Sequence, residues 1–355
     1  MLEYLLRFSI RKSSIIMLVV LALAALGIWN FTKLPIDAVP DITNVQVMIN
    51  TESPGYTPLE VEQRVTYPLE TALAGIPNLI STRSVSRYGL SQVTAIFSDE
   101  TDVYFARQLV NERLLSAKSD LPFGLEPELG PIATGLGEIF MFTVDAEPGA
   151  RNDEGELITA TDLRTVHDWI IRPQLMQVQG VVEVNPIGGF KREILVAFDP
   201  KKLLTFGVSQ QDVIQAIENN NDNKGAGFIE KNGAQWLLRI PGQAKSLKDL
   251  ANIPVKSTNG SVVRISDVAN VGEGKELRTG AATQNGREVV MSTVFMLIGE
   301  NSQRVAKAVG LRLEEVKESL PTGITVTAVY DRTKLVEKTL DTVKMNLLEG
   351  ALLVI

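Results

Sequence analysis

Hydrophobic residues are unevenly distributed along the chain, and the longest uninterrupted run lies near its start. Residues 13–32 carry no charge, and residues 15–29 are apolar apart from Gly27. A helix of about twenty residues is about 30 Å long, which matches the hydrocarbon thickness of a bilayer. Basic residues at positions 7, 11 and 12 precede the run. The positive-inside rule therefore predicts a transmembrane helix with a cytoplasmic N-terminus, and it predicts that the residues after Lys33 are exported.

A cleaved signal peptide is the alternative interpretation of this segment. Its start is basic, its apolar part is short, and Ala22-Leu23-Ala24 resembles a cleavage signal. Residues 2–11 have an amphipathic pattern, so a retained anchor would place them on the inner membrane surface. The two alternatives differ in whether the exported part stays attached to the membrane.

The exported part alternates between strand and helix patterns, and the order strand, helix, strand, strand, helix occurs twice. In the first unit, Thr57 is expected to cap a helix that begins at Pro58. In the second unit, Thr161 is expected to cap the corresponding helix. The expected strands are residues 45–50, 79–87, 90–98, 139–146, 181–186, 287–297 and 324–330, and the later helices are 102–118 and 302–319.

Two pairs of landmarks indicate an internal repeat with an insertion. Pro68 and Pro173 interrupt equivalent helices 105 positions apart, whereas the helix-ending Leu-Pro-x-Gly motifs at Pro122 and Pro321 are 199 positions apart. The second unit therefore contains about 94 additional residues, between positions 189 and 283. Their pattern predicts a small module with a helix at 209–220, a hairpin across Asn232-Gly233 and a strand at 262–265. Each repeated unit is expected to be a split βαβ or ferredoxin-like sandwich, which makes the fold class α+β.

The last residues return to a hydrophobic pattern. A helical periodicity begins at Thr333, and residues 350–355 are wholly apolar. An exposed apolar end is unfavourable for a soluble domain, so we expect a second membrane helix that continues beyond Ile355. This expectation favours a retained first helix over signal cleavage. The alternative is a C-terminal helix that packs on the core.

Composition and charge exclude several classes of function. The net charge is −7 without a long basic run, which argues against a nucleic-acid partner. Cysteine is absent and His167 is the single histidine, which excludes thiol catalysis, thiolate metal sites and zinc sites with several imidazoles. We expect no nucleophile–base constellation, because one histidine would have to serve scattered serines. Gly135-x-Gly137 lacks the strand–loop–helix context of a phosphate loop.

Several short motifs, taken together, resemble one known family over essentially the whole chain. They resemble the heavy-metal branch of the resistance-nodulation-division efflux pumps, and most closely its cobalt-zinc-cadmium members. The motifs are residues 40–45 (PDITNV), 53–56 (SPGY), 65–70 (VTYPLE), 73–75 (LAG), 84–89 (SVSRYG), 135–138 (GLGE), 180–184 (GVVEV) and 332–336 (RTKLV).

The resemblance implies an organisation into domains. It implies that this is the N-terminal part of a longer inner-membrane protein with a cytoplasmic N-terminus and a periplasmic region at 33–331. The implied parts are transmembrane helix 1 with its preceding segment (1–32), a first porter subdomain (33–134), a second porter subdomain (135–189 and 284–331), a docking subdomain inserted at 190–283, and a truncated transmembrane helix 2 (332–355).

The resemblance also implies a function. Such pumps are homotrimeric proton-driven antiporters that join a periplasmic adaptor and an outer-membrane channel, and they contact membrane lipid. The resemblance implies a transporter and no enzyme, with divalent metal ions as substrate and no cofactor. The proton-carrying carboxylates of the family lie on a later helix, beyond this sequence. The alternatives are a multidrug pump of the same fold and a membrane-anchored periplasmic adaptor or sensor.

Two carboxylates are the candidate metal ligands. Glu138 opens a strand directly after a glycine-rich turn, and Asp168 lies mid-helix beside His167. In the resembling divalent-metal pumps, acidic residues at these motif positions line the periplasmic metal cleft. Carboxylates suit Zn²⁺ and Co²⁺, whereas a thioether-rich site would suit Cu(I). We therefore expect Glu138 and Asp168 to contribute to a transient divalent site that is completed by residues outside this sequence.

Other polar and sulfur-containing residues are expected to have structural roles. His167 is expected to be a packed or hydrogen-bonded helix residue. The acidic residues of the loop 145–156 are expected to be solvated. The asparagine-rich segment 219–223 is expected to be a turn or to face a neighbouring subunit. Core positions are expected for Met141, Met176, Met291 and Met296.

Overall fold

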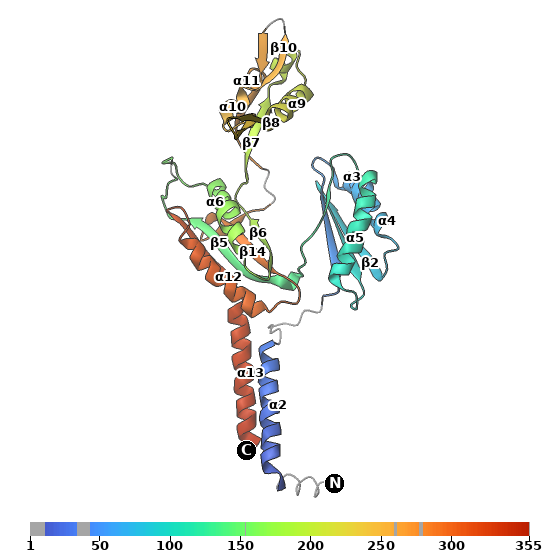
Figure 1. Cartoon of the computed structure of the whole chain (residues 1–355), viewed down its shortest axis with the longest axis vertical. Helices are drawn as coiled ribbons and strands as arrows, with labels where there is room; N and C mark the ends of the chain where they lie inside the picture. The colour runs from blue at the N-terminus through green and yellow to red at the C-terminus, as the bar shows by residue number, and fades with distance from the viewer. Residues whose placement is uncertain (1–10, 34–42, 153, 259–260, 277–279, 355) are drawn as a thin grey trace.

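The computed structural model describes residues 11–33, 43–152, 154–258, 261–276 and 280–354. Figure 1 shows a long first helix, α2 (Ser13–Lys33), and a long last helix, α13 (Arg332–Val354), that extend from the same end of the molecule. The mixed α and β units lie beyond them. The protein thus has the α+β organisation that the sequence predicts.

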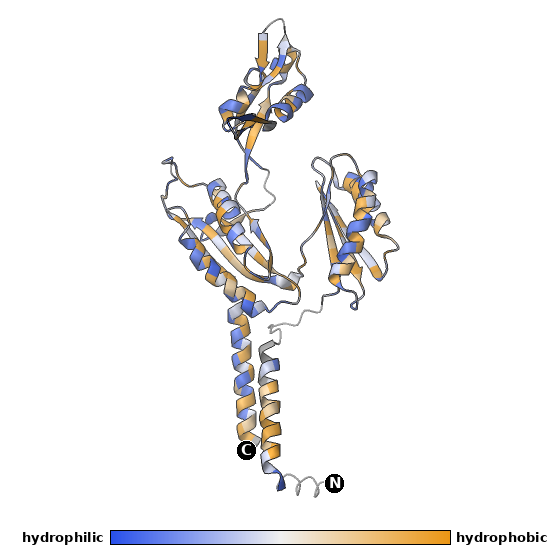
Figure 2. Cartoon of the chain, in the orientation of Figure 1, coloured by the Kyte–Doolittle hydropathy of each residue, from blue (hydrophilic) through white to orange (hydrophobic). Residues whose placement is uncertain are grey.

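Helix α2 presents apolar side chains to its surroundings. Leu18, Leu21 and Leu23 are each more than 60% exposed, and Figure 2 shows the predominantly hydrophobic colour of this helix. When the described residues alone are considered, no helix has the length and hydropathy needed to cross a membrane. The two predicted membrane spans therefore stay predictions.

The first unit is an antiparallel sheet covered by helices. The strands have the order β2-β3-β1-β4, which is the βαββαβ arrangement expected of a ferredoxin-like unit. Its core is built around Val47, Ile49, Leu69 and Phe97. The elements are β1 (Gln46–Glu52), α3 (Pro58–Val61), η1 (Glu62–Thr66), α4 (Tyr67–Leu73), β2 (Leu79–Arg87), β3 (Leu90–Phe97), α5 (Val103–Ala117), η2 (Lys118–Asp120) and β4 (Pro127–Leu129).

The start of the first helix follows the predicted capping chemistry. Thr57 accepts a hydrogen bond from the Glu60 backbone amide, and the Glu60 carboxylate accepts one from the Thr57 amide. This capping box satisfies amides that the helix itself leaves without partners, and Pro58 occupies a position where no donor is needed. The predicted cap at Thr57 is confirmed.

The prolines that mark the repeat follow π-helical turns and do not end their helices. In the first unit, the Tyr67 amide donates to the Glu62 carbonyl across the wider turn η1. The second unit has the same turn at η4 (His167–Ile171), where the Arg172 amide donates to the His167 carbonyl. Proline lacks an amide hydrogen and clashes with the preceding helical turn. A widened turn directly before it keeps the helix continuous, and such turns are frequent at functional sites.

The second unit repeats this architecture. Its sheet contains β5 (Glu138–Ala146) between β14 (Arg287–Met296) and β15 (Ile324–Asp331), with β6 (Val181–Ile187) and β13 (Ala282–Gln284) paired to β14. Phe142, Leu163, Val294 and Val309 belong to its core. The helical segments are η3 (Gly135–Gly137), α6 (Ala160–Val166), η4, α7 (Arg172–Leu175) and α12 (Ser302–Lys317).

The predicted cap of α6 is wrong by two residues. Thr159 caps this helix, because its hydroxyl accepts from the Asp162 amide while the Asp162 carboxylate accepts from the Thr159 amide. Thr161 lies inside the first turn and is buried. The side chain three positions after the threonine decides between the two candidates, since a capping box needs a carboxylate or amide there.

The inserted segment has its own hydrophobic core, which contains Leu203, Val213, Ile265 and Val268. The predicted hairpin is confirmed, because β8 and β9 pair across Asn232 and Gly233, which both have positive φ angles. The elements are β7 (Arg192–Phe198), α8 (Pro200–Phe206), α9 (Gln210–Asn220), β8 (Lys224–Lys231), β9 (Ala234–Ile240), α10 (Leu247–Ala251), β10 (Pro254–Thr258), β11 (Ser261–Arg264), α11 (Ile265–Val268) and β12 (Ala269–Lys275).

Strands β7 and β12 pair with each other and connect this module to the second unit (Figure 1). The boundary expected at residues 283 and 284 falls inside β13, which pairs with β14 of the second unit. The assignment of the units to porter and docking subdomains stays a prediction.

Candidate functional site

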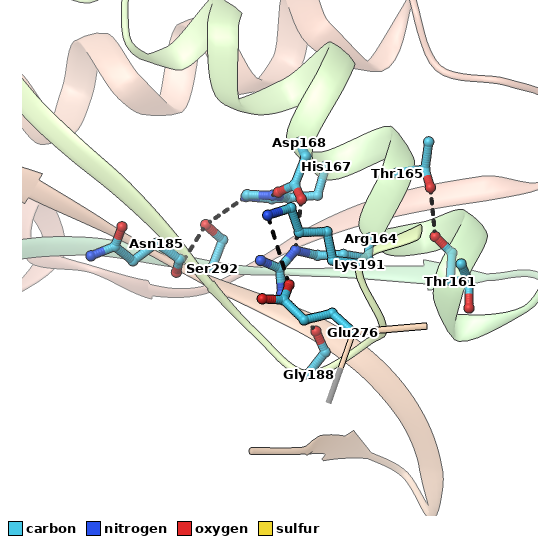
Figure 3. Close-up of polar contacts among 10 residues, drawn as sticks. All are labelled: Thr161, Arg164, Thr165, His167, Asp168, Asn185, Gly188, Lys191, Glu276 and Ser292. Atoms are coloured by element: carbon cyan, nitrogen blue, oxygen red, sulfur yellow. Dashed lines mark hydrogen bonds and ion pairs between the residues drawn. The ribbon is translucent and has the colours of Figure 1, made fainter. Parts of the chain in front are cut away.

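Asp168 and His167 belong to a chain of hydrogen bonds that joins the helical layer of the second unit to its sheet (Figure 3). His167 Nδ1 lies 2.8 Å from Asp168 Oδ1, and His167 Nε2 lies 2.9 Å from the Ser292 hydroxyl on β14. The other carboxylate oxygen of Asp168 accepts a hydrogen bond from Arg164 Nε at 2.8 Å. Arg164 also donates to the Gly188 carbonyl, and Ser292 contacts the Asn185 carbonyl.

Burial decides the protonation of this chain. His167 is completely buried, and loss of hydration lowers its pKa although the Asp168 carboxylate opposes that effect. The imidazole is therefore neutral at pH 7, and it donates from Nδ1 to Asp168 and accepts at Nε2 from Ser292. Burial alone would raise the pKa of Asp168, but the hydrogen bonds from His167 and Arg164 outweigh it and lower this pKa. Asp168 is thus a carboxylate with both oxygens engaged.

The order Ser292–His167–Asp168 is that of a nucleophile, a base and an orienting acid. We expected no nucleophile–base constellation, and this expectation was wrong as far as the arrangement of the three side chains is concerned. Ser292 and His167 both have zero exposure, so no substrate can reach the hydroxyl. A buried polar chain whose members satisfy one another specifies a unique packing arrangement. The prediction that His167 is a hydrogen-bonded helix residue is confirmed.

Glu138 lies at the opposite side of the sheet. It is the first residue of β5 and is directly opposite Phe295 on β14, whereas Val294 is opposite Phe140. Ile139 is thus an extra residue in β5, a β-bulge that turns Glu138 away from the face on which Phe140 and Val294 pack beneath the helices. Glu138 is partly buried.

Sequence reasoning missed Glu183, which the strand register places near Glu138. Strand β14 lies between β5 and β6, and its Phe295 is directly opposite Glu138 on β5 and Glu183 on β6. Glu183 is followed, toward the start of β6, by an extra residue, Val182. Residues directly opposite each other in a sheet share a face. Glu138 and Glu183 therefore lie on the same face, two strand spacings or about 10 Å apart. The signal in the sequence was the acidic residue of the GVVEV motif, which alternates with the buried Val184, but its nearness to Glu138 depends on the strand register and on the bulge in β5.

The structure does not bring Glu138 and Asp168 together. Asp168 lies in the helical layer and Glu138 points away from it. In the described part of the chain, histidine and carboxylate side chains form no group of three or more that could hold a metal ion. In the acidic loop, Asp145 pairs with Arg287 at 2.6 Å, and Glu154 and Glu156 are exposed.

A hollow of about 360 Å³ lies beside Asp168 and has a basic lining. Its charged residues are Asp168 and the cationic Arg164, Arg172, Lys191 and Arg192, and Trp169 at its edge is 79% exposed. Positive charge near a carboxylate opposes the approach of a divalent cation. The surroundings of Asp168 are therefore less suited to a metal ion than those of Glu138.

The methionines differ from the expectation in three of four cases. Met296 lies in the core, but Met176 is 39% exposed. Met141 and Met291 are partly buried on the sheet face away from the helices, because they are in register with Thr293 and Thr143 of that face. The period-two pattern of β5 and β14 was correct, but it could not say which face the helices cover.

Comparison with known proteins gives a match along nearly the whole chain. Residues 5–355 match the family model described as the AcrB/AcrD/AcrF family. The chain is 56% identical over 355 residues to the cation efflux system protein CzcA of Alcaligenes sp. (strain CT14), covering all of this chain and 33% of that protein. It is also 56% identical, with the same coverage, to the cobalt-zinc-cadmium resistance protein CzcA of Cupriavidus metallidurans.

A solved structure has the same fold. The crystal structure of a heavy metal efflux pump, crystal form II, matches with a TM-score of 0.86 and 30% identity, covering 99% of this chain and 34% of that one. The chain spans about one third of the length of the relatives that it matches.

Proposed function

Because the chain belongs to the AcrB/AcrD/AcrF family, in its heavy-metal efflux branch, we propose that it is the N-terminal part of a proton-driven pump that exports divalent cations of the zinc, cobalt and cadmium class. One observation carries this proposal, namely 56% identity along the entire chain to a cobalt-zinc-cadmium resistance protein. The role is that of a secondary transporter, and the metal ion is its substrate.

The pump has its first helix in the inner membrane, its N-terminus in the cytoplasm and residues 33–331 in the periplasm. The support is the full sequence of α2, which is free of charge before Lys33, and the basic residues that precede it. Helix α13 begins the second span. Its end is apolar, with Leu352 and Leu353 69% and 88% exposed.

The pump assembles as a homotrimer with a periplasmic adaptor and an outer-membrane channel. The hairpin β8–β9 of the inserted module supports a subunit contact, since Phe228 and Leu237 are directly opposite each other on one face and are 57% and 81% exposed. Large apolar side chains grouped on one surface are typical of protein interfaces.

Glu138 supplies a ligand to the transported cation, with Asp168 as a second carboxylate at a separate position. Glu138 suits the role because its side chain faces away from the packed core and its oxygens match a hard or borderline divalent ion. Asp168 can ligate a cation once its ion pair with Arg164 is broken and the metal ion takes the place of the guanidinium. The remaining ligands come from residues outside this sequence.

The test uses the full-length protein in a strain without metal export of its own. Glu138→Gln removes a negative ligand with little change of volume, and we expect zinc binding about tenfold weaker, a loss of about 1.4 kcal/mol, and lower zinc tolerance. Asp168→Asn is expected to have a smaller effect on tolerance. Glu156→Gln is the matched control, since Glu156 is an exposed carboxylate of the acidic loop.

Equal protein levels are verified by immunoblot. Unchanged zinc tolerance in Glu138→Gln rejects its role as a ligand. Resistance to cationic dyes without resistance to zinc, cobalt or cadmium rejects divalent metal export and favours a multidrug pump.

A further inference from the structure

Arg332 is the first residue of α13, and its side chain reaches the turn that precedes Glu138. Its guanidinium donates from Nη1 to the carbonyl of Leu136 in η3 (Gly135–Gly137). Arg332 is 4% exposed, so this charged group is held inside the protein. A charge-assisted hydrogen bond to a carbonyl is stronger than a neutral one. This hydrogen bond joins the start of α13 to Leu136, which is 196 positions earlier in the chain and two residues before Glu138.

The same region is connected to α13 without an intervening loop. Strand β15 ends at Asp331 and α13 begins at Arg332. The Asp331 carboxylate accepts from the Thr333 amide, which fixes the start of the helix, and Asp331 is opposite Phe140 on β5. A rotation of α13 about its first residues would therefore also move the end of the sheet where β5 begins.

The turn itself is held against β14. The Gly137 amide donates to the Thr134 carbonyl at 2.9 Å. A Cβ at Gly137 would be 3.1 Å from the Met296 carbonyl, which is closer than nearly all side chains permit. The turn thus has little room on the β14 side, and the Arg332 contact fixes it from α13. Bulges in β5, β6 and β15 near this end of the sheet leave Glu138 in a part of the strand with irregular pairing.

We propose that Arg332 is a positioning residue that ties the start of α13 to the η3 turn and thereby sets the position of Glu138. A displacement of α13 changes the geometry of the Glu138 carboxylate through this contact. The functional part of the proposal rests on the proposed role of Glu138 as a cation ligand. The structural part, the tie itself, does not.

The structural part is tested by hydrogen–deuterium exchange on the purified full-length protein. Arg332→Met keeps the length of the side chain and removes its donors. Exchange in peptides that cover residues 134–140 is expected to accelerate about tenfold, and Arg332→Lys is expected to restore part of the protection. Arg304→Met is the control, because Arg304, whose side chain is 63% exposed, forms an ion pair with Glu300 in the same unit. Unchanged exchange at 134–140 overturns the proposal, as does an equal acceleration throughout β14.

The functional part is tested by a double-mutant cycle with Glu138→Gln. We expect Arg332→Met to lower zinc tolerance about fivefold in the otherwise native protein and to have no further effect in the Glu138→Gln protein. Equal losses in both backgrounds overturn the claim that Arg332 acts through Glu138. If Glu138→Gln itself leaves tolerance unchanged, the role of Glu138 fails, and the exchange experiment still decides whether the tie exists.

Discussion

The two repeated units have the same strand order and the same π-helical turn before a proline, but they attach that turn to the sheet differently. In the first unit, the Thr66 hydroxyl lies 2.8 Å from that of Ser86 and 2.7 Å from that of Ser91. In the second unit, His167 makes the connection to Ser292, with an ionised Asp168 behind it. Neutral hydroxyls in one unit thus correspond to a charged, titratable chain in the other.

The ends of the two sheets also differ. In the first unit, the register of β2 against β3 shifts at Ile80, and β1 pairs with β3 without irregularity. In the second unit, the bulges of β5, β6 and β15 lie near the end where Glu138 and Glu183 are found. Bulges of this kind re-aim side chains at functional sites. The shared framework therefore sets the fold, while departures from it in the second unit place the candidate site.

The substitutions with the largest expected effect test whether the two units unfold independently. Phe142 and Phe97 are fully buried in the cores of the second and first units, respectively. Replacing either by alanine leaves a cavity and is expected to cost about 3–5 kcal/mol. Hydrogen exchange should show loss of protection in the second unit for Phe142→Ala and in the first unit for Phe97→Ala. Loss in both units from either substitution would contradict separate cores.

Much of this framework could be predicted from sequence because it depends on local chemistry. Thr57 with Glu60 specifies a capped helix start, and Asn232-Gly233 specifies a tight hairpin. The repeat and the insertion were evident from the different separations of two pairs of prolines, which punctuate equivalent helices of the two units. These features require knowledge of a few neighbouring residues only.

The candidate site depended on contacts that sequence spacing does not reveal. Ser292 is 125 positions from His167, and the inserted module lies between them, so no periodicity links the two. The face of Glu138 is set by the extra residue Ile139 in β5, because a single bulge reverses an alternating pattern. Asp168 was correctly placed on a helix, but its partner Arg164 and its basic surroundings became evident only with the fold.

A smaller effect is expected from removing the hydroxyls that join each π-helical turn to its sheet. Ser292→Ala leaves buried His167 Nε2 without this donor, and the cost of an unsatisfied buried group is about 1–3 kcal/mol. Ser91→Ala in the first unit should cost less, about 0.5–1.5 kcal/mol, because Thr66 keeps Ser86 as a partner. Urea unfolding followed by hydrogen exchange in each unit measures the difference. Equal costs would show that the buried histidine adds nothing to the attachment.

The smallest effect is a dependence of the second unit on pH. The folded-state pKa of His167 is lowered by burial, with Arg164 and Arg172 acting in the same direction and Asp168 opposing, so the unfolded chain takes up the proton first. Stability should fall as the pH drops below the ordinary histidine pKa of about 6.5, by no more than about 1.4 kcal/mol per pH unit. The lowered pKa of Asp168 adds a loss only below the ordinary aspartate pKa of about 3.9. Thermal unfolding between pH 7.5 and 5.5 should therefore show a decrease that is absent in His167→Gln, while the first unit, which has no histidine, stays constant by hydrogen exchange. A decrease of equal size in His167→Gln would assign the pH dependence to other groups.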